Sequence, residues 1–285
     1  MRRLIINADD FGLTAGVNRA IAEANRSGVL TSATIMANAR AFEEAAGQAR
    51  SQPSLRTGCH VVLIDGDPVS RNLPTLTNGT THFRNSLKEF ALAAVRRQIS
   101  AVEIQQETEA QICMIQSRGI TLTHVDSHKH THMFPHVLRP VLQAAKACGV
   151  RAVRNPFEPL RAWPYSAVMS TPALWLRSAG VTTFQMFAPE FRRTLKEEGM
   201  RSTDGTVGIA ATGKLDQKIL LRILTALPEG TWELVCHPGY SDGDLKAAGT
   251  RLTTSREIEL AALTSRETKE ALTRQKIELI SYAEL

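Results

Sequence analysis

The strongest constraint on the fold is a repeated alternation, along the chain, of short β-forming runs with amphipathic helical patterns. About seven such alternations occur, and they predict a parallel sheet with helices outside it. At 285 residues, a closed or partly closed (β/α) barrel is favoured over an open doubly wound sheet. No G-x-G-x-x-G follows the first strand-like run and no Walker A pattern occurs, so nothing points to a dinucleotide or nucleoside triphosphate site. We therefore expect a TIM-barrel-like α/β fold.

The expected elements follow from the period of the apolar residues and from end signals. Strands are predicted at residues 3–10, 30–38, 56–65, 120–128, 151–156, 206–212, 231–239 and 277–282. Helices are predicted at residues 14–28, 41–52, 86–98, 102–119, 136–150, 216–227 and 256–273. The first helix has a capping threonine, Thr14, and a closing glycine, Gly28.

One segment, residues 157–200, breaks the alternation. It holds two of the three tryptophans and four of the nine phenylalanines, together with four prolines. Either it is an insertion that shapes a substrate cleft, or it forms one or two barrel helices with proline-rich joins. The whole chain, residues 1–285, is expected to form a single domain.

Composition narrows the class of partner. Lysine and arginine exceed aspartate and glutamate by 34 − 28 = 6, but no basic block is longer than two residues, so we expect a solvated surface excess and no nucleic-acid partner. No apolar run reaches the ~18 residues of a membrane span. The basic and apolar start ends after six residues at Asp9 and Asp10, which predicts a cytoplasmic protein. The four cysteines are far apart and are expected to be reduced thiols, mostly in the core.

Polar residues suited to catalysis stand at the predicted ends of four strands. In a parallel barrel these ends meet at one rim, where functional residues collect. The set comprises Asp9, Asp10, His60, Asp126, His128 and His237. Two histidines and one carboxylate (Asp10, His60 and His128) match the ligand set of catalytic zinc with an open position for water. These residues predict a hydrolase that uses one divalent metal ion as its cofactor.

The adjacent carboxylates Asp9 and Asp10 need separate roles, because neighbouring residues on a strand point to opposite sides unless the strand has already ended. One can bind the metal while the other takes a proton from water. His237, across the rim, is the candidate acid for the leaving group. The alternative for the aspartates is a pair favoured by the dipole at a helix start.

The run "HVDSHKHTHMFPH", residues 124–136, looks like a metal cluster but cannot be one. If extended, its alternate polar positions would spread over about 26 Å, whereas metal ligands lie ~2 Å from one ion. We assign His128 as the single ligand and Asp126 as a supporting acid that orients a ligand or stabilises protonated His237. The other histidines stay open: His130 and His132 either bind substrate or make structural hydrogen bonds, and His124 and His136 are structural or exposed.

Four motifs occur in an order that resembles the YdjC-like (ChbG/HpnK) carbohydrate deacetylases: "NADDFG", "GCHVVL", "HVDSHKHTHMFP" and "CHPGY". They span residues 7–240. The segments "LIDGDPV" and "RAVRNPFEP" look closest to the hopanoid-associated HpnK branch. The resemblance implies a distorted (β/α) barrel related to polysaccharide deacetylases and a divalent metal, zinc or magnesium.

The resemblance also implies roles for single residues. Asp9 is the general base and His237 the general acid, and the metal ligands are Asp10, His60 and His128. By analogy with related deacetylases, Arg154 fixes Asp9 as an ion pair; a plain surface arginine is the alternative. Asn38, at the end of its strand, is a candidate contact to sugar hydroxyls.

The function implied is removal of the acetyl group from an N-acetylglucosamine-type sugar, carried by a hopanoid glycolipid on the HpnK reading. That reading suits a cytoplasmic protein in peripheral contact with the inner membrane surface, and a homodimer is a further expectation. Alternatives are a soluble chitooligosaccharide or disaccharide deacetylase, a non-catalytic metal-dependent sugar- or lipid-binding protein, and a phosphoesterase.

Overall fold

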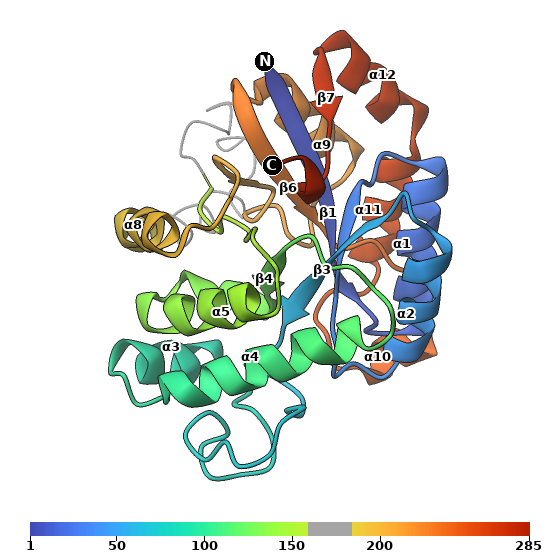
Figure 1. Ribbon diagram of the computed structural model, residues 1–285. Helices are drawn as coiled ribbons and strands as arrows, with labels where there is room; N and C mark the ends of the chain where they lie inside the picture. The colour runs from blue at the N-terminus through green and yellow to red at the C-terminus, as the bar shows by residue number, and fades with distance from the viewer. Residues whose placement is uncertain (159–183) are drawn as a thin grey trace.

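The computed structural model describes residues 1–158 and 184–285, and within them the chain forms a curled parallel sheet flanked by helices (Figure 1). The strands are β1 (Arg2–Phe11), β2 (Ser32–Ile35), β3 (Arg56–Val61), β4 (Val125–Ser127), β5 (Gly205–Val207), β6 (Gly230–Cys236) and β7 (Ile277–Leu279). Their order is β4-β3-β2-β1-β6-β5, with β7 also on β1, and every pairing is parallel. The predicted α/β class and barrel-like architecture are confirmed.

Strand β1 lies at the centre of the sheet because both of its edges are used. One edge pairs with β6 along most of its length. The other edge is divided: its first residues pair with β7, from Arg2 beside Ile277, and its last with β2, from Asn7 beside Ser32. From Leu4 onward every residue of β1 is buried. A strand covered on both faces reads as a nearly continuous apolar run, and this explains why "LII" precedes the acids.

The curl continues past β4 through isolated contacts rather than through a further full strand. Val125 bridges Val153, Ala152 bridges Arg201, and the backbone N–H of Thr206 donates to the carbonyl of Phe157 at 3.3 Å. The strand predicted at residues 151–156 was therefore wrong in extent, since only two bridging residues are present. Its path still carries the chain from β4 toward β5, so the sheet bends round as a distorted barrel.

Helices cover the outside of the sheet (Figure 1). They are α1 (Ala15–Ser27), α2 (Phe42–Ser51), α3 (Leu87–Val95), α4 (Ala101–Gln116), α5 (Pro135–Ala147), α8 (Ala188–Glu198), α9 (Gln217–Ala226), α10 (Gly243–Ala247), α11 (Ser255–Thr264) and α12 (Arg266–Arg274), with 3-10 turns η1 (His128–Met133), η2 (Phe184–Phe187) and η3 (Tyr282–Glu284). The cap expected at Thr14 is confirmed, because its side chain accepts from the backbone N–H of Val17 at 3.2 Å. The single helix predicted at 256–273 is wrong: Ser265 is extended and caps a second helix.

The segment predicted as a substrate-shaping insertion, residues 157–200, lies partly outside the described residues, which omit 159–183. Its described end forms η2 and α8, and α8 packs on α5. The single-domain expectation stays a prediction. Among the described residues, no helix combines the length and apolar character needed to cross a bilayer.

Candidate active site

The two adjacent aspartates at the end of β1 both face one site, and a backbone irregularity makes this possible. The register with β2 shifts between Ala8 and Phe11, and Asp10 has a left-handed φ of 65°. A bulge of this kind re-aims a side chain that regular alternation would turn away. Asp9 Oδ2 consequently lies 3.8 Å from Nε2 of His237, while Asp10 Oδ1 lies 3.7 Å from Nε2 of His60. Neighbouring residues of a regular strand would point to opposite sides, and this bulge is what lets Asp9 and Asp10 face the same site.

A metal-competent group forms beside Asp10. One donor atom each from Asp10, His60 and His128 lies within 4.8 Å of the other two. Asp10 Oδ1 is 3.7 Å from His60 Nε2 and 3.5 Å from His128 Nδ1. Ligands of a tetrahedral ion with bonds of 2.0–2.1 Å are about 3.3 Å apart, so small side-chain movements would bring these atoms to coordination distance. The three residues are those that the sequence predicted.

His60 is oriented from behind by Asp126. Its Nδ1 lies 2.7 Å from Asp126 Oδ1, and the hydroxyl of Thr34 donates to the other carboxylate oxygen at 2.9 Å. This contact fixes the ring and leaves Nε2 directed at the metal-competent group, a common arrangement for metal-binding histidines. A second possible metal group, Asp9, His60 and Asp126, suits a cation less well, because Arg154 already neutralises both of its carboxylates.

The glycine of "GCHVVL" has a steric cause. A Cβ at Gly58 would come within 2.4 Å of the ring of His124. That ring is buried and stacked on Tyr282, with centroids 3.7 Å apart. His124 is therefore a structural residue, one of the two alternatives left open for it.

His128 begins a tight turn instead of continuing a strand. Strand β4 ends at Ser127, and the 3-10 turn η1 contains two left-handed residues, Lys129 and His130, each with φ of 54°. The extended course assumed for residues 124–132 was therefore wrong, although the conclusion that the run is no single cluster holds. On its far side, His128 Nε2 lies 3.5 Å from Asp65 Oδ2, which also pairs with Lys129 at 2.5 Å. Such strained residues are typical of functional sites.

Arg154 is fully buried and is therefore not a surface arginine. Its guanidinium contacts three carboxylates: Asp9 Oδ1 at 2.6 Å, Asp126 Oδ2 at 2.8 Å and Glu233 Oε1 at 2.6 Å. Tyr282 donates a further hydrogen bond to Glu233. Burial alone would raise the pKa of Asp9, but the Arg154 charge, the nearby His60 and the hydrogen bond from Arg154 together lower it. Asp9 is thereby kept ionised in a buried place.

His237 lies between a base and a second acid. Its ring is mostly buried, with Nε2 toward Asp9 and Nδ1 at 4.0 Å from Glu259 Oε2. The same Glu259 oxygen accepts the backbone N–H of His237 at 2.6 Å. Burial lowers the pKa of His237 to about 4 and raises that of Glu259 to about 7. Asp126, offered from the sequence as a stabiliser of His237, instead faces His60 and Arg154.

Arg256, which was not predicted from the sequence, contacts the second carboxylate oxygen of Asp10. It is fully buried on α11 and its Nη2 lies 2.5 Å from Asp10 Oδ2. One oxygen of Asp10 is thus occupied, and Oδ1 is left for the two histidines. The arginine also explains the glycine of "CHPGY", because a Cβ at Gly239 would lie 2.8 Å from Arg256 Cδ.

Three residues of the site, Glu233, Arg256 and Glu259, were not predicted, and only the first gave a signal in the sequence. Glu233 is a charged residue within the apolar strand "TWELVC", and a buried charge of this kind signals a partner. Arg256 and Glu259 gave no such signal, because "SREIELAAL" reads as an ordinary helix with a solvated face. Only the packing of α11 against the rim buries them, at 0% and 1% exposure.

Three predicted site residues remain: His130, His132 and Asn38. Both ring nitrogens of His132 bond within the protein, to Ser127 Oγ at 2.5 Å and to the carbonyl of Arg154 at 3.1 Å, which favours its structural alternative. His130 is half-buried, and its Nδ1 has no hydrogen-bond partner within the described part of the chain. Asn38 donates to the carbonyl of Asp67 at 2.7 Å.

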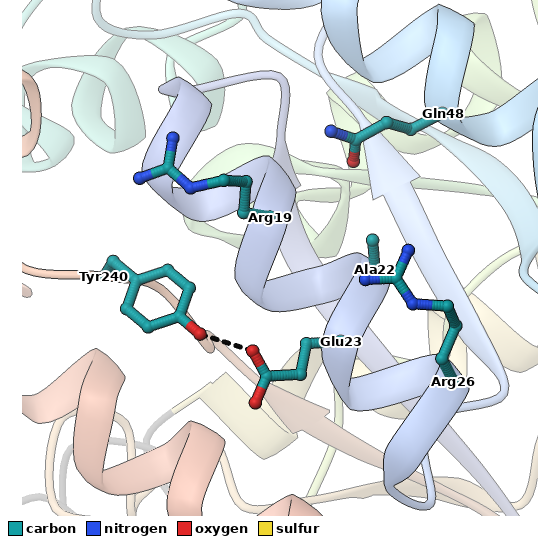
Figure 2. Close-up of a pocket in the computed structure, with 6 residues that line it drawn as sticks. All are labelled: Arg19, Ala22, Glu23, Arg26, Gln48 and Tyr240. Atoms are coloured by element: carbon teal, nitrogen blue, oxygen red, sulfur yellow. Dashed lines mark hydrogen bonds between the residues drawn. The ribbon is translucent and has the colours of Figure 1, made fainter.

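A separate groove of about 500 Å³ lies along the outer side of α1. Figure 2 shows its lining side chains: Arg19, Ala22, Glu23, Arg26, Gln48 and Tyr240. The Tyr240 hydroxyl donates to Glu23, and the Arg19 guanidinium lies 5.7 Å from the centre of the Tyr240 ring. None of the predicted site residues lines this groove, so the chemistry described above lies elsewhere.

Comparison with known proteins identifies relatives over the full chain. A carbohydrate deacetylase of Brevibacillus brevis is 34% identical over 99% of both chains, and one of Geobacillus stearothermophilus is 34% identical over 99% of this chain and 98% of its own. A solved Enterococcus faecalis V583 structure, described as a candidate cellobiose-phosphate cleavage protein, has a TM-score of 0.78 at 25% identity and covers 99% of this chain and 98% of its own. The family described as YdjC-like protein matches residues 3–274. This chain belongs to the YdjC-like family.

Proposed function

We propose that this protein is a metal-dependent carbohydrate deacetylase that hydrolyses the N-acetyl group of an N-acetylglucosamine-type sugar. The observation that carries the proposal is the pairing of two sites: the donor atoms of Asp10, His60 and His128 within 4.8 Å of one another, and Asp9 at 3.8 Å from His237. Full-length relatives named carbohydrate deacetylases support the reaction class.

The donor set fits one divalent ion. His60 would offer Nε2, His128 Nδ1 and Asp10 Oδ1, a set of two histidines and one carboxylate that suits zinc and leaves a position for water. Magnesium is the alternative, although it prefers oxygen ligands. When bound, such an ion polarises the acetyl carbonyl and lowers the pKa of water from ~15.7 toward ~7.

Asp9 is assigned as the general base that takes the proton from the attacking water. Its carboxylate stays ionised because Arg154 contacts both oxygens, at 2.6 and 2.8 Å. A base held in one orientation loses little entropy in the transition state. Asn7 adds a hydrogen bond from its amide at 3.1 Å.

His237 is assigned as the acid that protonates the departing amine. Because the ring is buried and its Nδ1 has no hydrogen-bond partner among the residues described, the imidazole favours the neutral form, as its lowered pKa indicates. Glu259 is the positioning residue that can correct this, because its carboxylate holds the His237 backbone and lies 4.0 Å from Nδ1. A small rotation of either side chain would close the bond and favour imidazolium.

The test is acetate release. Purified protein supplied with Zn²⁺ or Mg²⁺ should release acetate from N,N′-diacetylchitobiose or from an N-acetylglucosaminyl lipid, and Asp9→Asn should reduce kcat by about 10²- to 10⁴-fold. Sugar binding with no acetate from either substrate, at any of the metals tried, would leave a non-catalytic binding protein and overturn the proposal.

The lipid-linked substrate is a finer proposal. It is supported by the resemblance of "LIDGDPV" and "RAVRNPFEP" to the hopanoid-associated branch. In addition, α3 exposes Leu92 and Val95 (48% and 61%) next to Arg96 and Arg97, a combination suited to an anionic lipid surface. A higher kcat/KM for the glycosylated lipid than for diacetylchitobiose is expected, and the reverse order would favour the soluble substrate.

Glu259→Gln should lower kcat about tenfold with little change in KM, and should move the basic limb of the pH profile of kcat/KM to lower pH. The amide still accepts the His237 backbone N–H but no longer stabilises the protonated ring. Glu257→Gln is the matched control: Glu257 lies on the same helix and accepts the backbone N–H of Ser241 at 2.8 Å. If both variants show the same pH profile as the parent, Glu259 has no part in positioning the acid.

A further inference from the structure

Two cysteines that are distant in sequence lie side by side on the helical layer. The sulfur atoms of Cys113, on α4, and Cys148, just after α5, are 3.8 Å apart. Cys113 is exposed and Cys148 half-buried, whereas Cys59 and Cys236 are buried. The expectation that the cysteines lie mostly in the core holds for Cys59 and Cys236 but not for Cys113. An accessible thiol next to a second one is the arrangement in which a disulfide forms most easily.

The two helices that would be joined support two segments of the active-site rim. Helix α4 holds the loop after β3, since Gln111 bonds both backbone groups of Val62 and Glu107 accepts the N–H groups of Val69 and Ser70. That loop carries Asp65, whose carboxylate lies 3.5 Å from His128 Nε2. Helix α5 directly follows η1, which begins with His128 itself.

We propose that Cys113 and Cys148 form a reversible dithiol–disulfide site that reacts with small disulfides and locks α4 to α5. The S–S bond length is about 2.05 Å, so the two sulfurs must approach by about 1.8 Å from their separation of 3.8 Å. The site is independent of the proposed hydrolase activity, because neither cysteine touches the residues assigned to it.

The reaction proceeds by two exchanges. The Cys113 thiolate attacks one sulfur of a disulfide RSSR, forming a mixed disulfide and releasing RS⁻. Cys148 then attacks the Cys113 sulfur and releases the second RS⁻; the two protons lost by the cysteines complete two RSH. Cys113 is the entry point because it is exposed, while burial and the neighbouring Cys113 raise the pKa of Cys148 to about 12.

The test uses the full-length protein with oxidised glutathione. Peptide mapping without reduction should find the Cys113–Cys148 bond within single chains. Tm should rise by about 5 to 10 °C, because the bond closes a loop between residues 35 positions apart. Reduction should reverse both changes, and Cys113→Ser and Cys148→Ser should each abolish the shift.

Three outcomes would overturn the proposal: mixed disulfides that persist without an internal bond, cross-linked dimers as the main product, or an internal bond without a rise in Tm. Acetate release is measured separately on reduced protein. A failure of that assay would bear on the proposed hydrolase and not on the dithiol.

Discussion

His128→Ala is expected to abolish metal binding and to lower kcat/KM by at least about a thousandfold, since a bound ion contributes several kcal/mol of transition-state stabilisation and each 1.36 kcal/mol is tenfold. His128 supplies one of only two imidazole nitrogens in the group around Asp10. With it removed, two protein ligands remain, too few for a catalytic zinc site. Metal content after dialysis and acetate release would measure the two effects.

The matched control is His136→Ala, in the same histidine-rich run. His136 Nε2 lies 2.7 Å from the carbonyl of Ile99 at the base of α4, and it belongs to no metal-competent group among the residues described. We expect unchanged metal stoichiometry and kcat. Equal losses in the two variants would mean that the run acts as a unit and would contradict the assignment of His128 as its one ligand.

Arg154→Met is expected to destabilise the fold by about 3–5 kcal/mol at pH 7, because removing one partner of a buried ionic cluster leaves uncompensated charges. The three carboxylates that contact this arginine, on Asp9, Asp126 and Glu233, are all buried. Denaturant unfolding would measure the loss. Arg151→Met, three residues earlier and exposed, should change stability by less than about 0.5 kcal/mol.

The loss should also depend on pH, in a direction set by the lowered pKa values of Asp9 and Asp126. In the parent protein their stabilising effect is present above the unfolded pKa near 3.9 and is lost as the pH falls through the folded values. In the variant, burial without the guanidinium raises these pKa values, so protonation relieves the penalty as the pH drops. The difference between parent and variant should therefore shrink from pH 7 to pH 5. A constant difference would show that lost packing, not charge, is responsible.

The local elements were predictable because each depends on neighbours in the chain. Apolar periodicity located α1 and its cap at Thr14, and a β-forming run ending in acids located β1. Errors arose where the tertiary structure overrides the local pattern. The run around His128 was assumed to be extended, but after Ser127 the chain turns into a 3-10 segment. The segment from residue 151 forms no full strand, because only Ala152 and Val153 make bridges to other parts of the chain.

The sequence by itself determined the class of fold, the family and the set of acids and histidines from which a site could be built, because residue type and spacing carry that information. Only the tertiary structure decided how those groups pair. The bulge at Asp10 turns two neighbouring carboxylates to one site, Arg154 reaches Asp9 across 145 positions, and Arg256 reaches Asp10 across 246. Such contacts depend on how the sheet curls and which helix covers its rim, and no local period encodes that geometry.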